Sequence, residues 1–350
     1  MLPLLIQSAH WGLALVPVLI LLAVFVWLDA FKLMSMREIV VLLVLGGLGA
    51  LAAWPVAGRF LDTLPIGFSI YSRCIAPWIE EAIKAAIMIL LFRLNRIGYK
   101  LDAVISGFAI GAGFSVAENI IYLVRFPDYG VGTWLVRGLG TAVMHGTTLA
   151  LLAAIAHELS ERATRQSAAD FKLQLWWFVP GYVVAGLLHM AFNHFPDRPM
   201  VAMMGALLVA PVVLMAVFHF GTSEAQQWLH AEYAEHQEQL ASLRAGRWPG
   251  GPSGERIAAL AGRTDPETAT RLRRYWELQA WLVVEAEETM IEEADGNAQF
   301  DPTQIRAAFA ELAGLRRAIG RTTFAAFKAL LPFSRNDEWE VAELRERIGR

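Results

Sequence analysis

The sequence contains only one cysteine, Cys74, and few charged residues, since 18 % of its 350 residues are Asp, Glu, Lys or Arg. A single cysteine has no partner within the chain, which excludes a disulfide-stapled scaffold and argues against a cysteine-rich zinc site. The formal net charge of −3 offers no basic surface for nucleic acid. Hydrophobic residues make up 56 % of the chain, which points away from an ordinary soluble enzyme.

The charges are unevenly distributed along the chain. Residues 1–221 contain 26 charged residues, whereas residues 222–350 contain 37. A bilayer core requires roughly 20 mostly apolar residues per helix, and seven segments of the first part approach this length: 11–28, 39–57, 75–92, 101–123, 139–156, 175–195 and 200–220. We therefore predict an all-α, polytopic transmembrane helix bundle of about seven spans (1–221), followed by a soluble helical domain (222–350).

The basic residues of the loops predict the orientation. One set of alternate loops carries eight of them, and the intervening loops carry five, Arg137 included. By the positive-inside rule, the first set is cytoplasmic. The N-terminus is then expected outside and the C-terminal domain in the cytoplasm. The larger set comprises Lys32, Arg37, Arg93, Arg96, Lys100, Arg162, Arg165 and Lys172.

The C-terminal region has the start signals of several helices. A charged helix is expected to continue the last span over residues 222–245. The Gly- and Pro-rich stretch 247–254 is predicted to be a linker. Two capping patterns, each with a proline near the first turn, open helices over about 264–295 and 301–319. No internal repeat and no strand-rich region interrupts this helical pattern.

Several predicted spans contain ionisable side chains, each of which costs about 2.5–3.5 kcal/mol at the centre of a bilayer and so marks function by default. One lysine, Lys84, can share a helix face with either Glu80 or Glu81, but it cannot neutralise both. The other polar residues in the spans are Glu118, Asn119, His145, His189, Asn193 and His194.

Four of these groups occur at one predicted depth. Glu80, Glu118, His145 and His189 lie five or six residues from the outer ends of their spans, which corresponds to roughly 7–9 Å. We therefore predict a single site that draws residues from four helices. Small residues in the same spans permit close helix packing: Gly107, Gly111, Gly113, Gly138, Gly140, Gly146, Gly181 and Gly186. The remaining histidines are expected to be solvated: His10, His157, His219, His230 and His236.

Three short motifs in these spans resemble those of a known family. The sequence EEAIK (80–84) is similar to EExxK, FSVAE (114–118) to FxxxE, and HMAFN (189–193) to Hxxx(D/N). Together with His145, they resemble the PrsW family of intramembrane proteases, which is distantly similar to the CAAX-processing membrane proteases. The resemblance covers roughly residues 70–200.

The resemblance implies a membrane-embedded peptidase of the bacterial cell membrane. Its substrate would be a single-span membrane protein, such as an anti-sigma factor, cut near its extracytoplasmic face. In the CAAX relatives the second motif ends in histidine, whereas here it ends in Glu118. The charged tail has no counterpart in the resemblance, and no partner of this domain is implied.

Peptide hydrolysis requires an activated water, donors for the developing oxyanion and a proton for the leaving amine. In a metal-free mechanism, Glu80 or Glu81 activates the water, and Lys84 holds this pair of carboxylates. His189 and Asn193 then donate to the oxyanion, and Glu118 and His145 position the water or carry the proton.

Zinc provides the competing mechanism. Two imidazoles and a carboxylate, here His145, His189 and Glu118, form a plausible zinc set with an open position for water. Glu81 is then the base. The spacing of these residues does not separate the two versions, because the ligands come from different helices.

The same buried polar network is compatible with two non-proteolytic functions. A transporter could use it as a proton or ion relay, and a non-catalytic scaffold or immunity-type protein could use it to organise a membrane complex. Paired repeats and broken helices would favour transport, and the sequence shows no such repeat. These alternatives stay open beside the peptidase hypothesis.

Overall fold

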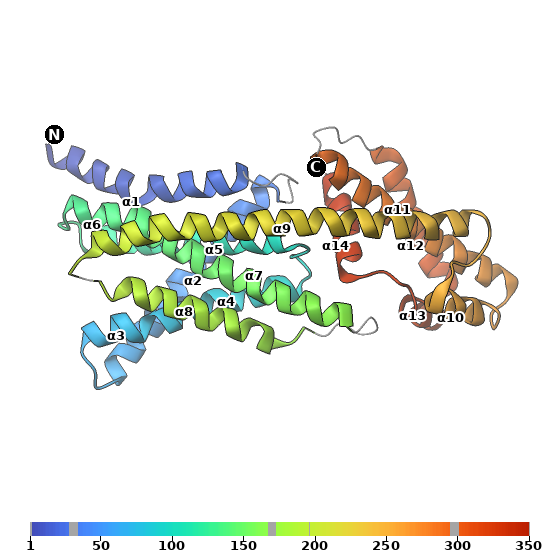
Figure 1. Cartoon of the computed structure of the whole chain (residues 1–350), viewed down its shortest axis with the longest axis horizontal. Coiled ribbons are helices and arrows are strands. Elements are labelled where there is room, and N and C mark those ends of the chain that lie inside the picture. Colours follow the sequence, from blue (N-terminus) through green and yellow to red (C-terminus); the bar gives the residue numbers. More distant parts are fainter. Residues whose placement is uncertain (1, 28–33, 167–172, 196, 295–300, 350) are drawn as a thin grey trace. The chain divides into compact units, whose positions relative to one another are not determined.

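The computed structural model describes residues 2–27, 34–166, 173–195, 197–294 and 301–349, and every regular element in these ranges is a helix. The predicted all-α class is therefore confirmed. The chain divides into two compact units, Met1–Thr222 and Ser223–Arg350. Figure 1 shows the helices of both units along the sequence.

The first unit is built from the following elements: α1 (Leu2–Trp27), α2 (Met36–Thr63), α3 (Phe68–Cys74), α4 (Ala76–Arg93), α5 (Lys100–Arg125), α6 (Val131–Leu135), the π-helix η1 (Val136–Thr141), α7 (Ala142–Gln166), the 3₁₀-helix η2 (Leu175–Phe178), α8 (Val179–Asn193) and the first part of α9 (Pro199–Arg244).

Within the described ranges, six helices are long and apolar enough to cross a membrane. They are α1, α2, α5, the continuous run from α6 through α7, η2 with α8, and the first part of α9. The segment predicted at 75–92 corresponds to α4, which is not among the six because it carries Glu80, Glu81, Lys84 and Arg93. A seventh span thus remains a prediction.

The sequence interpretation placed the start of the fifth span too late, at residue 139. The helix starts at Val131 rather than at residue 139, because η1 joins α6 to α7 without a break. Arg137 therefore lies inside a helix and not in an external loop. The sequence interpretation counted Arg137 among the loop residues, whereas its charge is compensated within the bundle, as described below.

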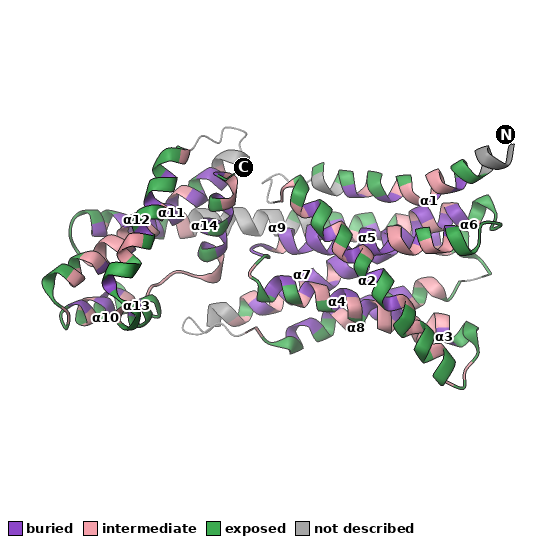
Figure 2. Ribbon diagram, turned by 180° about the vertical axis from the view of Figure 1, so that it is seen from behind, coloured by how far each residue is buried: buried purple, intermediate pink, exposed green. Residues whose placement is uncertain are grey.

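Helix α5 forms the centre of the first unit and packs against α2 and α7. Figure 2 shows the buried residues concentrated along these inner helices, whereas α3 begins with exposed residues. Glycines allow the close contacts: a β-carbon at Gly113 would overlap the backbone of Leu43 in α2, and one at Gly111 would overlap the carbonyl of His145 in α7. The predicted role of these glycines in helix packing is borne out.

Substitution of Gly111 by alanine is expected to lower the stability of the protein by about 1–3 kcal/mol, as for other overpacked cores, and to reduce activity by shifting His145. The matched control is Gly205→Ala in α9, where an added β-carbon meets nothing within 4 Å. Thermal unfolding in detergent measures both variants. Equal stability of the two variants would show that α5 and α7 tolerate wider spacing at this level.

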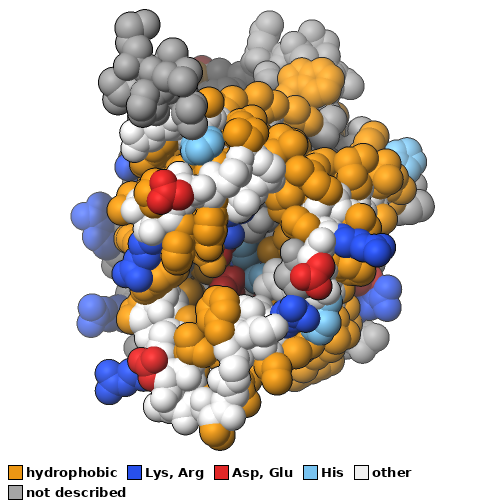
Figure 3. All heavy atoms as spheres, turned by 90° about the vertical axis from the view of Figure 1, so that its left-hand side faces the viewer, with side chains coloured by type: hydrophobic (Ala, Val, Ile, Leu, Met, Phe, Trp, Pro, Cys, Tyr) orange, Lys and Arg blue, Asp and Glu red, His pale blue; other side chains and the backbone are white. Residues whose placement is uncertain are grey.

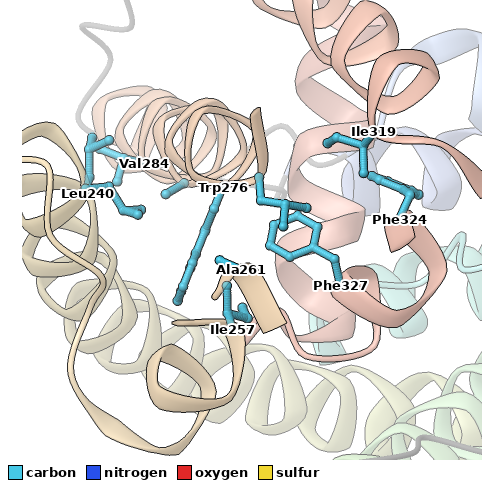
Figure 4. Packing of buried hydrophobic residues seen from close by; sticks show 11 residues of the cluster. Leu240, Ile257, Ala261, Trp276, Val284, Ile319, Phe324 and Phe327 are labelled. Carbon is cyan, nitrogen blue, oxygen red and sulfur yellow. The ribbon is translucent and has the colours of Figure 1, made fainter. Parts of the chain in front are cut away.

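The second unit contains the last part of α9 with α10 (Gly251–Ala261), α11 (Pro266–Ala294), α12 (Pro302–Ile319), α13 (Arg321–Lys328) and α14 (Arg335–Arg347). One core of this unit surrounds Trp276 and Phe327 (Figure 4), and a second is centred on Leu282 and Ile305.

The predicted start signals in this unit hold with small corrections. Asp301 caps α12 by accepting from the backbone of Thr303 and Gln304, as expected. The side chain that caps α11 is that of Asp265, one residue later than predicted. The stretch 247–254 is only partly a linker, because α10 begins at Gly251 with a proline in its first turn.

Candidate functional site

Four helices of the first unit bring ionisable side chains into one cluster. Helix α4 contributes three of them, and α5, α7 and α8 contribute one each. Hydrogen bonds and close ion pairs connect these side chains across the helices. The cluster consists of Glu80, Glu81, Lys84, Glu118, His145 and His189.

Glu81 is the innermost carboxylate, and its side chain is 0 % exposed. Its Oε1 atom accepts hydrogen bonds from Lys84 Nζ at 2.6 Å, from His189 Nδ1 at 2.8 Å and from Thr148 Oγ1 at 3.2 Å. The other oxygen, Oε2, is buried and has no hydrogen-bond partner in the described part of the chain. Glu81 therefore ties α4 to both α7 and α8 while one of its oxygens stays available.

His145 links the lysine to the outer part of the cluster. Its Nδ1 atom lies 2.9 Å from Lys84 Nζ, and its Nε2 atom lies 3.2 Å from Glu118 Oε2. An ammonium group has no acceptor atom, so Nδ1 accepts in this arrangement and Nε2 carries the proton toward Glu118. The ring is perpendicular to that of His189, with centroids 4.9 Å apart.

His189 has the complementary arrangement. Its Nδ1 atom donates to Glu81, which leaves Nε2 as the atom with a free lone pair. This Nε2 atom faces Glu80 Oε2 at 3.7 Å. Of the two histidines, His189 has the arrangement common at metal-binding imidazoles, in which one ring N–H is donated to a carboxylate and the other nitrogen is free, whereas Nδ1 of His145 accepts from Lys84.

Arg137 is the positive partner of Glu118. Its Nη2 atom lies 3.1 Å from Glu118 Oε2, its Nε donates to Asn119 Oδ1 at 3.0 Å, and its guanidinium lies 3.6 Å from the ring centroid of Tyr122. It projects from the π-helix η1, a type of helical irregularity that is frequent at functional sites. Sequence reasoning missed Arg137 and Thr148 as site residues. The available signal was the apolar run on both sides of Arg137, which is typical of a span.

The cluster is graded from buried to accessible. The side chains of Glu80 and Glu118 are 17 % and 18 % exposed, whereas that of His145 is 1 % exposed. Figure 3 shows a hollow at one end of the first unit, with acidic and histidine side chains at its floor. Two of the glutamates can therefore meet water, while Glu81 and Lys84 stay behind them.

Asn193 is not part of the hydrogen-bonded cluster. Its amide donates to the backbone carbonyl of Ser72 at 3.1 Å and so connects α8 to α3. The adjacent His194 bonds to the carbonyl of Met190 in its own helix. Of the seven side chains predicted from the sequence as one site, the structure thus brings six together and gives Asn193 a contact at the edge.

One group in this unit has the composition of a metal site. Glu80, His145 and His189 each offer a ligand atom, and these atoms lie within 4.8 Å of one another. The sequence interpretation placed Glu118 in this set instead of Glu80. Glu118 lies beside His145 but is already paired with Arg137, so Glu80 is the carboxylate with fewer competing contacts.

Comparison with known proteins identifies one family. A family model described as PrsW family intramembrane metalloprotease matches residues 4–220. No curated protein and no solved structure matches the chain. The matched region contains all six residues of the cluster and ends before the second unit begins.

Proposed function

The chain belongs to the PrsW family of intramembrane metalloproteases, and we propose that it hydrolyses a peptide bond of a single-span membrane protein of the anti-sigma-factor type. The cut lies near the extracytoplasmic face of a bacterial cell membrane. The observation that carries this proposal is the convergence of three glutamates and two histidines from four helices at a water-accessible hollow.

The residues present fit a divalent metal ion such as Zn²⁺. Glu80, His145 and His189 supply one oxygen and two nitrogens, the donor types that zinc binds in hydrolases. His145 Nε2 can bind the ion only when it carries no proton. A proton on Nδ1 instead would require Lys84 to give up its contact with that atom and to keep its hydrogen bond to Glu81. When bound, the ion supplies a Lewis acid that polarises the scissile carbonyl.

The side chains of this chain perform the proton transfers. Glu118 is the partly exposed carboxylate outside the donor set, and the contact with Arg137 keeps it charged and oriented. It accepts a proton from the attacking water and returns it to the leaving amine. Arg137 is the cation beside this base, and its proposed role is to stabilise the negative charge that develops on the substrate oxygen.

Glu81 and Lys84 are positioning residues. Glu81 fixes the ring of His189, and Lys84 contacts both Glu81 and His145, so this pair determines where the imidazoles point. Asn193 supports the site from further away by holding α8 against α3. This assignment differs from the sequence interpretation, because Glu81 is fully buried and Asn193 is engaged elsewhere. There the base was Glu80 or Glu81 in the metal-free mechanism, with Asn193 as an oxyanion donor, and Glu81 in the zinc mechanism.

The same proposal includes α4 as a seventh span. The charged side chains of Glu81 and Lys84 are fully buried against α7 and α8, so α4 does not expose them to lipid. Seven spans place the N-terminus outside and residues 222–350 in the cytoplasm. The accessible end of the cluster then faces the extracytoplasmic side.

Cleavage by purified protein in lipid vesicles tests the proposal. Wild-type protein is expected to cut single-span substrates, whereas His189→Ala, which removes an imidazole from the donor set, is expected to be inactive but folded. Fragments are identified by mass spectrometry. Equal cleavage by both proteins would refute the assignment. If folded, membrane-inserted wild-type protein cleaves nothing, that result would favour the scaffold or transporter function.

Removal of metal provides a separate prediction. Dialysis against a strong chelator is expected to abolish cleavage, and one equivalent of Zn²⁺ at this cluster is expected to restore it, because the ion is the proposed Lewis acid of the reaction. Metal content and activity are measured on the same samples. Full activity in metal-free protein would support the metal-free mechanism, in which a glutamate alone activates the water.

A further inference from the structure

A second cluster of buried ionisable residues lies in the C-terminal unit. It combines His236 from α9, Glu287 from α11 and Asp337 from α14. The side chains of these residues are 7 %, 0 % and 2 % exposed. His236 was expected to be solvated, and its burial corrects that expectation. Three helices that are distant in the sequence thus bring these side chains together at one buried point.

The hydrogen bonds of this cluster leave two oxygens without a partner. His236 Nδ1 lies 2.8 Å from Glu287 Oε1, and His236 Nε2 lies 3.7 Å from Asp337 Oδ2. Within the described residues, Glu287 Oε2 and Asp337 Oδ1 are buried and have no hydrogen-bond partner. The two oxygens of a carboxylate share one carbon, so both unpartnered atoms lie at the cluster itself. Buried oxygens of this kind can be satisfied by a bound water or a bound ion.

The charges of the cluster do not balance. One imidazole faces two carboxylates, and Glu232 and Glu235 add negative charge nearby. A bound cation would supply the positive charge that the imidazole alone cannot.

The donor set indicates which cation is suitable. The ligand atoms of the three residues lie within 4.8 Å of one another, and ligands of a tetrahedral ion at bond lengths of about 2.0–2.2 Å are roughly 3.3 Å apart. To hold one ion, the three side chains would close this spacing, and His236 would give up its hydrogen bond to Glu287. One imidazole and two carboxylates suit Zn²⁺ and related transition-metal ions, whereas Ca²⁺ and Mg²⁺ prefer oxygen ligands alone.

We propose that His236, Glu287 and Asp337 bind a divalent transition-metal ion of the Zn²⁺ type, which joins α9, α11 and α14. The site is structural, because all three side chains are almost completely buried and leave no room for a peptide substrate. It belongs to the unit outside the matched family region and is independent of the cluster in the first unit.

The test uses full-length, untagged protein in which His145→Ala and His189→Ala remove two donors of the first unit. After treatment with a chelator, this background protein is expected to bind one Zn²⁺ per chain by calorimetry and metal analysis. Adding Glu287→Gln is expected to weaken binding at least about tenfold. The matched control is Glu288→Gln, which changes the adjacent, exposed residue of α11 and is expected to leave the affinity unchanged.

Thermal unfolding distinguishes metal binding from a purely structural ion triad. Zn²⁺ is expected to raise the melting temperature of the background protein and of the Glu288→Gln control, but not that of Glu287→Gln. Asp337→Asn serves as a second variant if Glu287→Gln does not fold. Zn²⁺ that binds with equal affinity to all of these variants, or does not bind to the background protein, would overturn the proposal and leave an imidazole held between two carboxylates.

Discussion

Glu118→Gln is expected to lower the cleavage rate about 10²–10⁴-fold, the usual contribution of a general acid or base, while the metal content stays unchanged. The amide is isosteric with the carboxylate and can still contact Arg137, but it cannot accept a proton from water. Glu80→Gln is expected to reduce activity and metal content together, because the carboxylate in the proposed donor set is lost.

Metal content therefore separates the roles of the two glutamates. The measurements are the cleavage rate in vesicles and the zinc content of each purified variant, with Asp128→Asn as a control for an exposed carboxylate of the first unit. The assignment is wrong if Glu118→Gln loses the metal and Glu80→Gln keeps it. That result would support the ligand set predicted from the sequence, in which Glu118 joins His145 and His189.

The sequence was sufficient to predict which residues form the candidate site but not how they pair. Ionisable residues in an apolar span require partners, so Glu81, Lys84 and His189 stood out without any structure. Their pairing depends on helix rotation and on side-chain rotamers, which the order of residues along one helix does not specify. The sequence therefore joined Lys84 to both glutamates, whereas the lysine contacts Glu81 and His145.

Arg137 and His236 show a different reason for errors. Both residues were interpreted by their type, as a loop cation and as a solvated histidine, because charged and titratable side chains are usually exposed. Each is instead compensated by groups that come from other helices, Glu118 for Arg137 and Glu287 for His236. Contacts between distant segments of this kind are not visible in local sequence patterns.

Lys84→Met is expected to destabilise the first unit by about 3–5 kcal/mol, the usual cost of removing one partner of a buried ion pair. The lysine and Glu81 are both 0 % exposed and 2.6 Å apart, so the substitution leaves the carboxylate buried without its cation. Lys100→Met is the matched control, because Lys100 pairs with Glu158 near the surface, where an ion pair contributes only about 0–1 kcal/mol.

The double variant Lys84→Met/Glu81→Gln separates charge balance from site geometry. Removing both charges is expected to recover most of the lost stability, since no unpaired charge remains. Activity is expected to stay low, because the glutamine no longer holds His189 through a charged hydrogen bond and His145 has lost its contact with the lysine. Unfolding in detergent and cleavage in vesicles measure the two effects. Recovery of activity together with stability would contradict the positioning role, because a pair needed only for stability could be replaced by any neutral pair that packs as well.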